Sequence, residues 1–81
     1  MLLTRTWPYG TRKRVKVLSI EFLKGMRIMA CQEVDGAQEG FILMEGPNAV
    51  ATAEGEIGEI VFCQGGERGA HWRYHGECIP F

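Results

Sequence analysis

The fold is decided by the stretch Arg-Lys-Arg-Val-Lys-Val-Leu-Ser-Ile-Glu-Phe, residues 12–22. Val15 and Val17 share one parity, whereas Leu18 and Ile20 share the other. Because side chains of a β-strand alternate between its two faces, this stretch predicts a strand whose apolar face changes between Val17 and Leu18. Such a change indicates a β-bulge or a sharp coil, as a closed barrel requires.

Glycine punctuates the chain on both sides of this stretch. Eleven Gly residues divide 81 residues into short pieces rich in Val, Ile, Phe and Trp, a pattern typical of small antiparallel sheet proteins. Residues 46–54 suit either a loop with one helical turn or a short strand. The sequence therefore predicts an all-β domain, a small five-stranded antiparallel barrel of the SH3-like or OB-like type. Besides residues 12–22, its strands are expected at residues 26–34, 41–45, 59–64 and 70–75, with a tight hairpin loop at residues 65–69.

A local resemblance agrees with this architecture. Gly55-Glu56-Ile57-Gly58-Glu59-Ile60, followed by Gly65-Gly66 and Ala70-His71-Trp72, resembles the Gly-x-x-Gly-x-Val/Ile turn and strand of SH3-like barrels of the KOW type. The resemblance covers about a quarter of the chain. It implies a barrel that binds nucleic acid or protein, as such barrels commonly do.

Size and composition limit the kinds of protein to which the chain can belong. A length of 81 residues fits one domain, residues 1–81, with residues 1–11 as an N-terminal arm. No window is apolar enough to span a membrane, and the N-terminus lacks the pattern of a secretory signal. Three cysteines at wide spacing favour reduced thiols over a disulfide framework. We therefore expect a cytoplasmic protein.

The charge is polarised along the chain although the total is only −1. Residues 1–27 carry seven basic side chains and one acidic, whereas residues 28–81 carry two basic and nine acidic. Three interpretations are open: cross-strand ion pairs between basic and acidic strands, a basic face for phosphate backbones, or a contact between subunits of opposite local charge.

A basic and aromatic segment near the N-terminus is the candidate nucleic-acid site. Small barrels bind nucleic acid by combining cations along the backbone with aromatic rings that stack on bases. Outward-facing Arg73 would extend the patch if the fifth strand lay near the first. The candidate residues are Trp7, Tyr9, Arg12, Lys13, Arg14, Lys16 and Arg73. The alternative for the aromatic residues is that they close the open end of the barrel.

The favoured function is that of a non-catalytic interaction module that self-associates or binds a protein partner. The second and third strands carry apolar side chains on both faces, and a small fold cannot cover all of them. The candidate interface residues are Met29, Cys31, Phe41, Leu43, Ile79 and Phe81.

No catalytic site, metal or cofactor is expected. His71 and His75 lie four apart on an extended strand, which places them too far apart to share one ion. With Cys78 and Cys63 nearby, core thiols beside solvated histidines are the commoner arrangement. The loop at residues 65–69 lacks the strand-then-helix context of a phosphate-binding loop.

Overall fold

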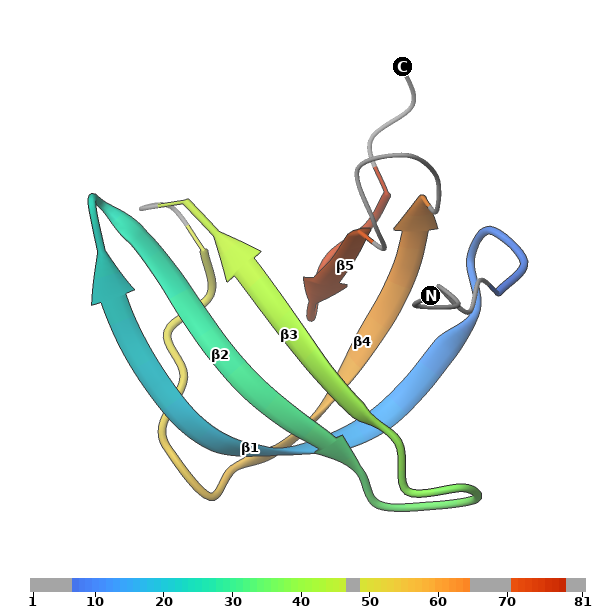
Figure 1. Ribbon diagram of the computed structural model, residues 1–81. Coiled ribbons are helices and arrows are strands. Elements are labelled where there is room, and N and C mark those ends of the chain that lie inside the picture. The colour runs from blue at the N-terminus through green and yellow to red at the C-terminus, as the bar shows by residue number, and fades with distance from the viewer. Residues whose placement is uncertain (1–6, 47–48, 65–70, 79–81) are drawn as a thin grey trace, which may run out of the picture.

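Five antiparallel strands form a single curved sheet in the computed structural model, which describes residues 7–46, 49–64 and 71–78 (Figure 1). The spatial order of the strands is β3-β2-β1-β4-β5, so β3 and β5 are the two edges. The described residues contain no helix, and hence none long and apolar enough to cross a membrane. The strands are β1 (Arg12–Leu23), β2 (Met26–Glu33), β3 (Gly40–Glu45), β4 (Ile57–Gln64) and β5 (His71–Tyr74).

The prediction of five antiparallel strands is confirmed, but closure into a barrel is not. Strand β1 is long and strongly bent, so that its first part pairs with β4 and its later part with β2 (Figure 1). No backbone ladder joins β3 to β5 in the described part of the chain. Of residues 46–54, the described ones (46 and 49–54) form neither the helical turn nor the short strand considered for that stretch. The predicted hairpin loop at residues 65–69 lies outside the described residues.

The bend in β1 occurs where the sequence predicts it. The register with β2 shifts between Val17 and Ser19, which leaves Leu18 as the extra residue of a β-bulge. Just before the bulge, where the pairing with β4 ends at Lys16, the Val17 backbone pairs with the β3–β4 connection: its N–H donates to the Glu56 carbonyl at 2.8 Å, and its carbonyl accepts from the Gly55 N–H at 2.7 Å. The connection therefore takes the place of β4 beside β1 at Val17.

The core lies on the concave face of the sheet. Every strand contributes alternate side chains to it, and Ile20 and the half-buried Trp7 pack against its margin. The ring of Trp7 lies 5.1 Å from that of Trp72, 5.6 Å from Phe41 and 5.7 Å from Phe62, centroid to centroid. The core residues are Val15, Val17, Met29, Cys31, Phe41, Leu43, Ile60, Phe62, Trp72 and Tyr74.

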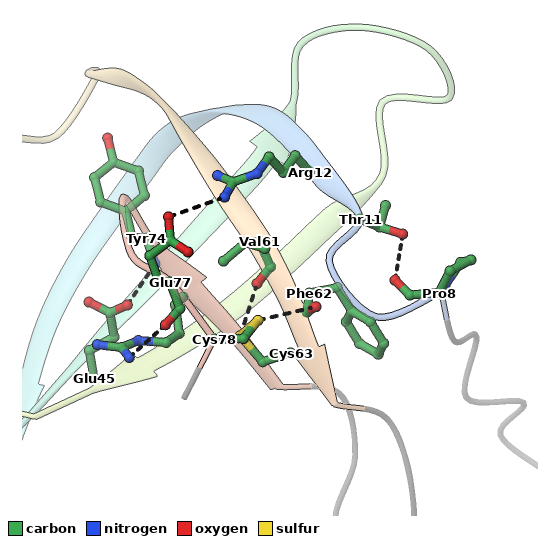
Figure 2. Close-up of a disulfide and its surroundings, with 11 residues drawn as sticks. Pro8, Thr11, Arg12, Glu45, Val61, Phe62, Cys63, Tyr74, Glu77 and Cys78 are labelled. Atoms are coloured by element: carbon green, nitrogen blue, oxygen red, sulfur yellow. Dashed lines mark hydrogen bonds and ion pairs between the residues drawn. A yellow bond between two sulfur atoms is a disulfide. The ribbon is translucent and has the colours of Figure 1, made fainter. Parts of the chain in front are cut away.

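A buried ion pair lies where β3 approaches β5. Arg27 of β2 donates from Nη2 to Glu45 Oε2 of β3 at 2.8 Å, and both side chains are almost fully buried. The other carboxylate oxygen, Oε1, accepts the backbone N–H of Tyr74 of β5 at 2.7 Å (Figure 2). A side chain thus makes the bridge between the two edge strands that a backbone ladder makes in a closed barrel.

A disulfide joins β4 to the segment after β5, which corrects the expectation of three reduced thiols. Cys63 and Cys78 are bonded to each other, and only Cys31 is free among the described cysteines (Figure 2). Burial raises the pKa of the Cys31 thiol to about 11, so this thiol is protonated and unreactive at neutral pH. The cytoplasmic location loses the support of the reduced-thiol argument and stays a prediction.

Gly58 leaves the space that the Tyr74 ring fills in the core. A Cβ atom at this position would lie 2.1 Å from Tyr74 Oη, far inside van der Waals contact. The Tyr74 hydroxyl also donates to Glu56 Oε2 at 2.5 Å, which fixes the ring in place. The pKa of this hydroxyl is raised by its burial and by the hydrogen bond to Glu56.

We predict that Gly58→Ala lowers the free energy of unfolding by about 1–3 kcal/mol, because overpacking displaces the Tyr74 ring. Urea unfolding followed by fluorescence measures the loss. Gly46→Ala is the matched control, since nothing lies within 4 Å of a Cβ atom there. Equal unfolding midpoints for the two variants would contradict the packing role of Gly58.

Candidate functional site

The two arginines of β1 are paired with carboxylates of this same chain. Arg14 binds Asp35 through two hydrogen bonds, Nε to Oδ2 at 2.9 Å and Nη2 to Oδ1 at 3.0 Å. The hydrogen bond from Arg14 holds the pKa of Asp35 below its usual value. Arg12 Nη1 lies 2.8 Å from Glu59 Oε1 on the neighbouring strand. Of the three interpretations of the polarised charge, ion pairing within the sheet is the one that these contacts match.

The two lysines of β1, Lys13 and Lys16, lie in different surroundings from the two arginines. The Lys13 Nζ lies 3.7 Å from the buried Glu33 Oε2 and 6.0 Å from the centroid of the Trp7 ring. Lys16 is exposed on the outer face of β1, opposite Ile57 of β4. The seven candidate nucleic-acid residues therefore do not form one surface of free cations.

The C-terminal part of the chain covers the outer face of β4. Glu77 approaches Arg12, with 3.7 Å between Oε1 and Nη2, and its backbone carbonyl accepts from Arg73 Nη1 at 2.9 Å (Figure 2). The disulfide of Cys78 anchors this segment. Strand β4 lies between Arg73 on β5 and the first strand, and the Arg73 guanidinium binds the covering segment, so the condition for extending the basic patch is not met.

The two aromatic candidates, Trp7 and Tyr9, lie in different environments. Trp7 packs against three core aromatic rings, so it closes the end of the sheet and is not a free stacking platform; here the structure corrects its assignment to a nucleic-acid surface. Tyr9 is 66% exposed. A single exposed ring beside paired cations is a weak basis for binding single strands.

Four of the six predicted interface residues belong to the core, which is a correction of their assignment. Met29 and Cys31 of β2 and Phe41 and Leu43 of β3 are buried on the concave face. The predicted alternation of faces along residues 26–34 agrees with the structure, but on both strands the outward-facing residues are the alternate ones, such as Ile28 and Ile42. The remaining two interface candidates, Ile79 and Phe81, lie outside the described residues.

The alternate residues of the same two strands form an apolar surface on the outer face, exposed on β3 and half-buried on β2. Ile28 pairs with Met44, and Ala30 pairs with Ile42, in two adjacent cross-strand rows. Ile42 is 63% exposed and Met44 is 56% exposed. We call these four residues, together with the exposed Leu18 at the bulge, the convex apolar face. The alternation of residues 26–34 and 41–45 could have identified it, had the direction of sheet curvature been known.

Comparison with known proteins adds no relative to this description, since no family model, curated protein or solved structure matches the chain. The basic side chains of β1 and the convex apolar face are therefore the two surfaces that bear on function.

We predict that single-stranded DNA binding is limited by the paired carboxylates. A variant with Asp35→Asn and Glu59→Gln frees Arg14 and leaves Arg12 only its longer contact with Glu77, so the slope of log affinity against log salt should steepen by about 0.7–1.4, at about 0.7 per freed cation. Fluorescence anisotropy at several salt concentrations measures the slope.

The matched control carries Glu21→Gln and Glu54→Gln, which change the net charge equally at positions away from these pairs. The wild-type protein could instead bind single-stranded DNA tightly with a steep salt slope, and the Asp35 and Glu59 variant could show the same slope. That result would contradict the prediction, because Arg12 and Arg14 would then be available to DNA despite their ion pairs.

Proposed function

We propose that the chain is a non-catalytic interaction module that self-associates through the convex apolar face. The observation that carries the proposal is a pair of apolar cross-strand rows, with the exposed Ile42 and Met44 on the edge strand and the half-buried Ala30 and Ile28 beside them on β2. Isolated exposed apolar residues are ordinary, but a contiguous patch on a sheet face marks an interaction site.

A second copy of the chain is the partner that this surface fits best. Charges of opposite sign flank the patch on β1, with Lys16 on one side and Glu21 on the other, and both are exposed. In a two-fold contact, Lys16 of one protomer can face Glu21 of its partner while the apolar rows pack together. A domain of this size also has a modest core, so added burial stabilises it.

The absence of catalysis is part of the same proposal. Three pairs that include a buried polar side chain link parts of the sheet: Arg27 with Glu45, Tyr74 with Glu56, and Glu33 with Lys13. These pairs hold the edge strands and the β3–β4 connection, which argues for a structural role.

We also propose a type of fold, an SH3-like or OB-like barrel, and an alternative function, nucleic-acid binding. A strongly bent first strand with antiparallel neighbours is compatible with both SH3-like and OB-like barrels, and the Gly55–Gly58 turn favours the SH3-like type. Nucleic-acid binding, the alternative function, has less support because Arg12 and Arg14 are paired within the chain.

We predict that the wild-type protein forms a dimer at high concentration and that Ile42→Lys with Met44→Lys restores the monomer mass of 9.1 kDa. The lysines place charge in the centre of the proposed contact. Size-exclusion chromatography with light scattering measures the mass.

The matched control is Val50→Lys, which places a lysine at an exposed apolar residue outside the convex apolar face. This variant should remain dimeric. A wild-type mass near 9 kDa at every concentration, or dimers in the Ile42 and Met44 variant, would contradict self-association through this face.

A further inference from the structure

Residues 75–78, which follow β5, fold back over the outer face of the sheet, and we call them the strap. His75 has a φ of 51°, a left-handed conformation, and lies at the bend where the chain leaves β5. Gly76 then passes close to Arg73, since a Cβ atom at Gly76 would lie only 3.2 Å from Arg73 Nε. Cys78 ties the strap to β4 through its disulfide (Figure 2).

One cross-strand row of the sheet, formed by Arg12, Val61 and Arg73, lies on the face that the strap covers. Val61 of β4 pairs with Arg12 of β1 on one side and with Arg73 of β5 on the other. The row faces away from the core, because Val61 alternates with the core residues Ile60 and Phe62. Val61 is nevertheless only 3% exposed. An apolar side chain between two arginines is therefore hidden on the side where the strap lies.

The noncovalent contacts that hold the strap beyond its first residue are weak. The Glu77 carbonyl accepts from Arg73 Nη1 at 2.9 Å, and 3.7 Å separates Glu77 Oε1 from Arg12 Nη2. The Glu77 side chain is 92% exposed, and a solvated ion pair of this kind stabilises little. The contact of Cys78 Sγ with the Phe62 carbonyl, at 3.5 Å, depends on the position of the bonded sulfur. The disulfide is therefore the main tie between the strap and β4.

Thiol–disulfide exchange can open this tie at Cys78. Cys78 is half-buried whereas Cys63 is only 7% exposed, so an external thiolate reaches Cys78 Sγ more easily. Attack by one thiolate of a small dithiol breaks the S–S bond, and Cys63 Sγ leaves as a thiolate and takes up a proton. The second thiolate of the dithiol then displaces Cys78 Sγ, which is protonated in turn. The dithiol is oxidised to a disulfide, and the two cysteines are reduced to thiols.

We propose that the Cys63–Cys78 disulfide is a redox-controlled catch: its reduction releases the strap and opens the covered row to single-stranded nucleic acid. Release removes the Glu77 acceptor from Arg73 and leaves Arg12 with Glu59 alone. Two guanidinium groups beside an apolar side chain suit a nucleotide, which has an anionic phosphate and a base with apolar faces. The choice of ligand rests on the alternative function proposed above, whereas the release of the strap does not.

Amide NMR spectra before and after reduction with dithiothreitol test the release. We expect the signals of Val61 and Glu77 to shift, while that of Leu43 in the core stays in place, because β3 contains neither cysteine of the disulfide. Unchanged Glu77 signals would show that the strap stays on β4 without its disulfide. Loss of dispersion throughout the spectrum would show that the disulfide holds the whole fold together. Either result would overturn the catch.

Fluorescence anisotropy with an oligothymidylate, at several salt concentrations in the oxidised and the reduced state, tests the ligand. Reduction should steepen the slope of log affinity against log salt by about 0.7–1.4, at about 0.7 per uncovered cation. Once NMR has shown release, an equal slope in the two states or no binding in the reduced state would overturn nucleic acid as the ligand. Equally tight binding of polyglutamate would overturn it as well, in favour of an acidic protein segment.

Two variants provide matched controls for the effect of the dithiol. Cys78→Ser lacks the catch and should show the steeper salt slope with or without dithiothreitol. Glu77→Gln keeps the disulfide and loses only the long ion pair with Arg12, so it should respond to dithiothreitol as the wild-type protein does. A Cys78→Ser variant that still responds to dithiothreitol would assign the redox effect to another thiol, such as Cys31, and would overturn the proposal.

Discussion

The carboxylate of Glu45 is the interaction on which the rest of the structure depends. It accepts from Arg27 on β2 and from the backbone of Tyr74 on β5, so one side chain links the two edges of an open sheet. Burying two charges is unfavourable unless each is paired and hydrogen-bonded. Here both carboxylate oxygens have a donor. The pair thus sets the approach of β3 to β5 without the continuous ladder of a closed barrel.

The two faces of the sheet follow from that geometry. The bulge at Leu18 bends β1, and the bent sheet wraps its concave face around the aromatic core. The apolar side chains of opposite parity on β2 and β3 then face outward, where Ile42 and Met44 of β3 are exposed and Ile28 and Ala30 of β2 are half-buried. On the concave side, Arg27 is held between Glu45 and the β3–β4 connection, and a cavity lies beside it at the end of the β1–β2 hairpin. One curved sheet therefore presents two different surfaces.

Much of the local structure could be predicted from the sequence, whereas the choice of face could not. Alternation and glycine punctuation predicted the five strands and the bulge, because these depend on neighbouring residues. The inward parity of β2 and β3 depends on the direction of curvature, and both of their faces are apolar. The pairing of Arg14 with Asp35 and of Cys63 with Cys78 depends on distant segments that meet only in the folded chain. The role of Trp7 is similar: its ring joins the core only because β3, β4 and β5 converge beside it.

A double-mutant cycle on Arg27 and Glu45 tests the central claim most directly. Arg27→Met and Glu45→Leu should each lower the free energy of unfolding by about 3–5 kcal/mol, since each leaves a buried charge unpaired. The double variant should lose clearly less than the sum of the two. Arg14→Met with Asp35→Leu, at an exposed ion pair, should change stability little and without strong coupling. Small or additive losses at Arg27 and Glu45 would contradict the account, because the edges of the sheet would then be held together by something else.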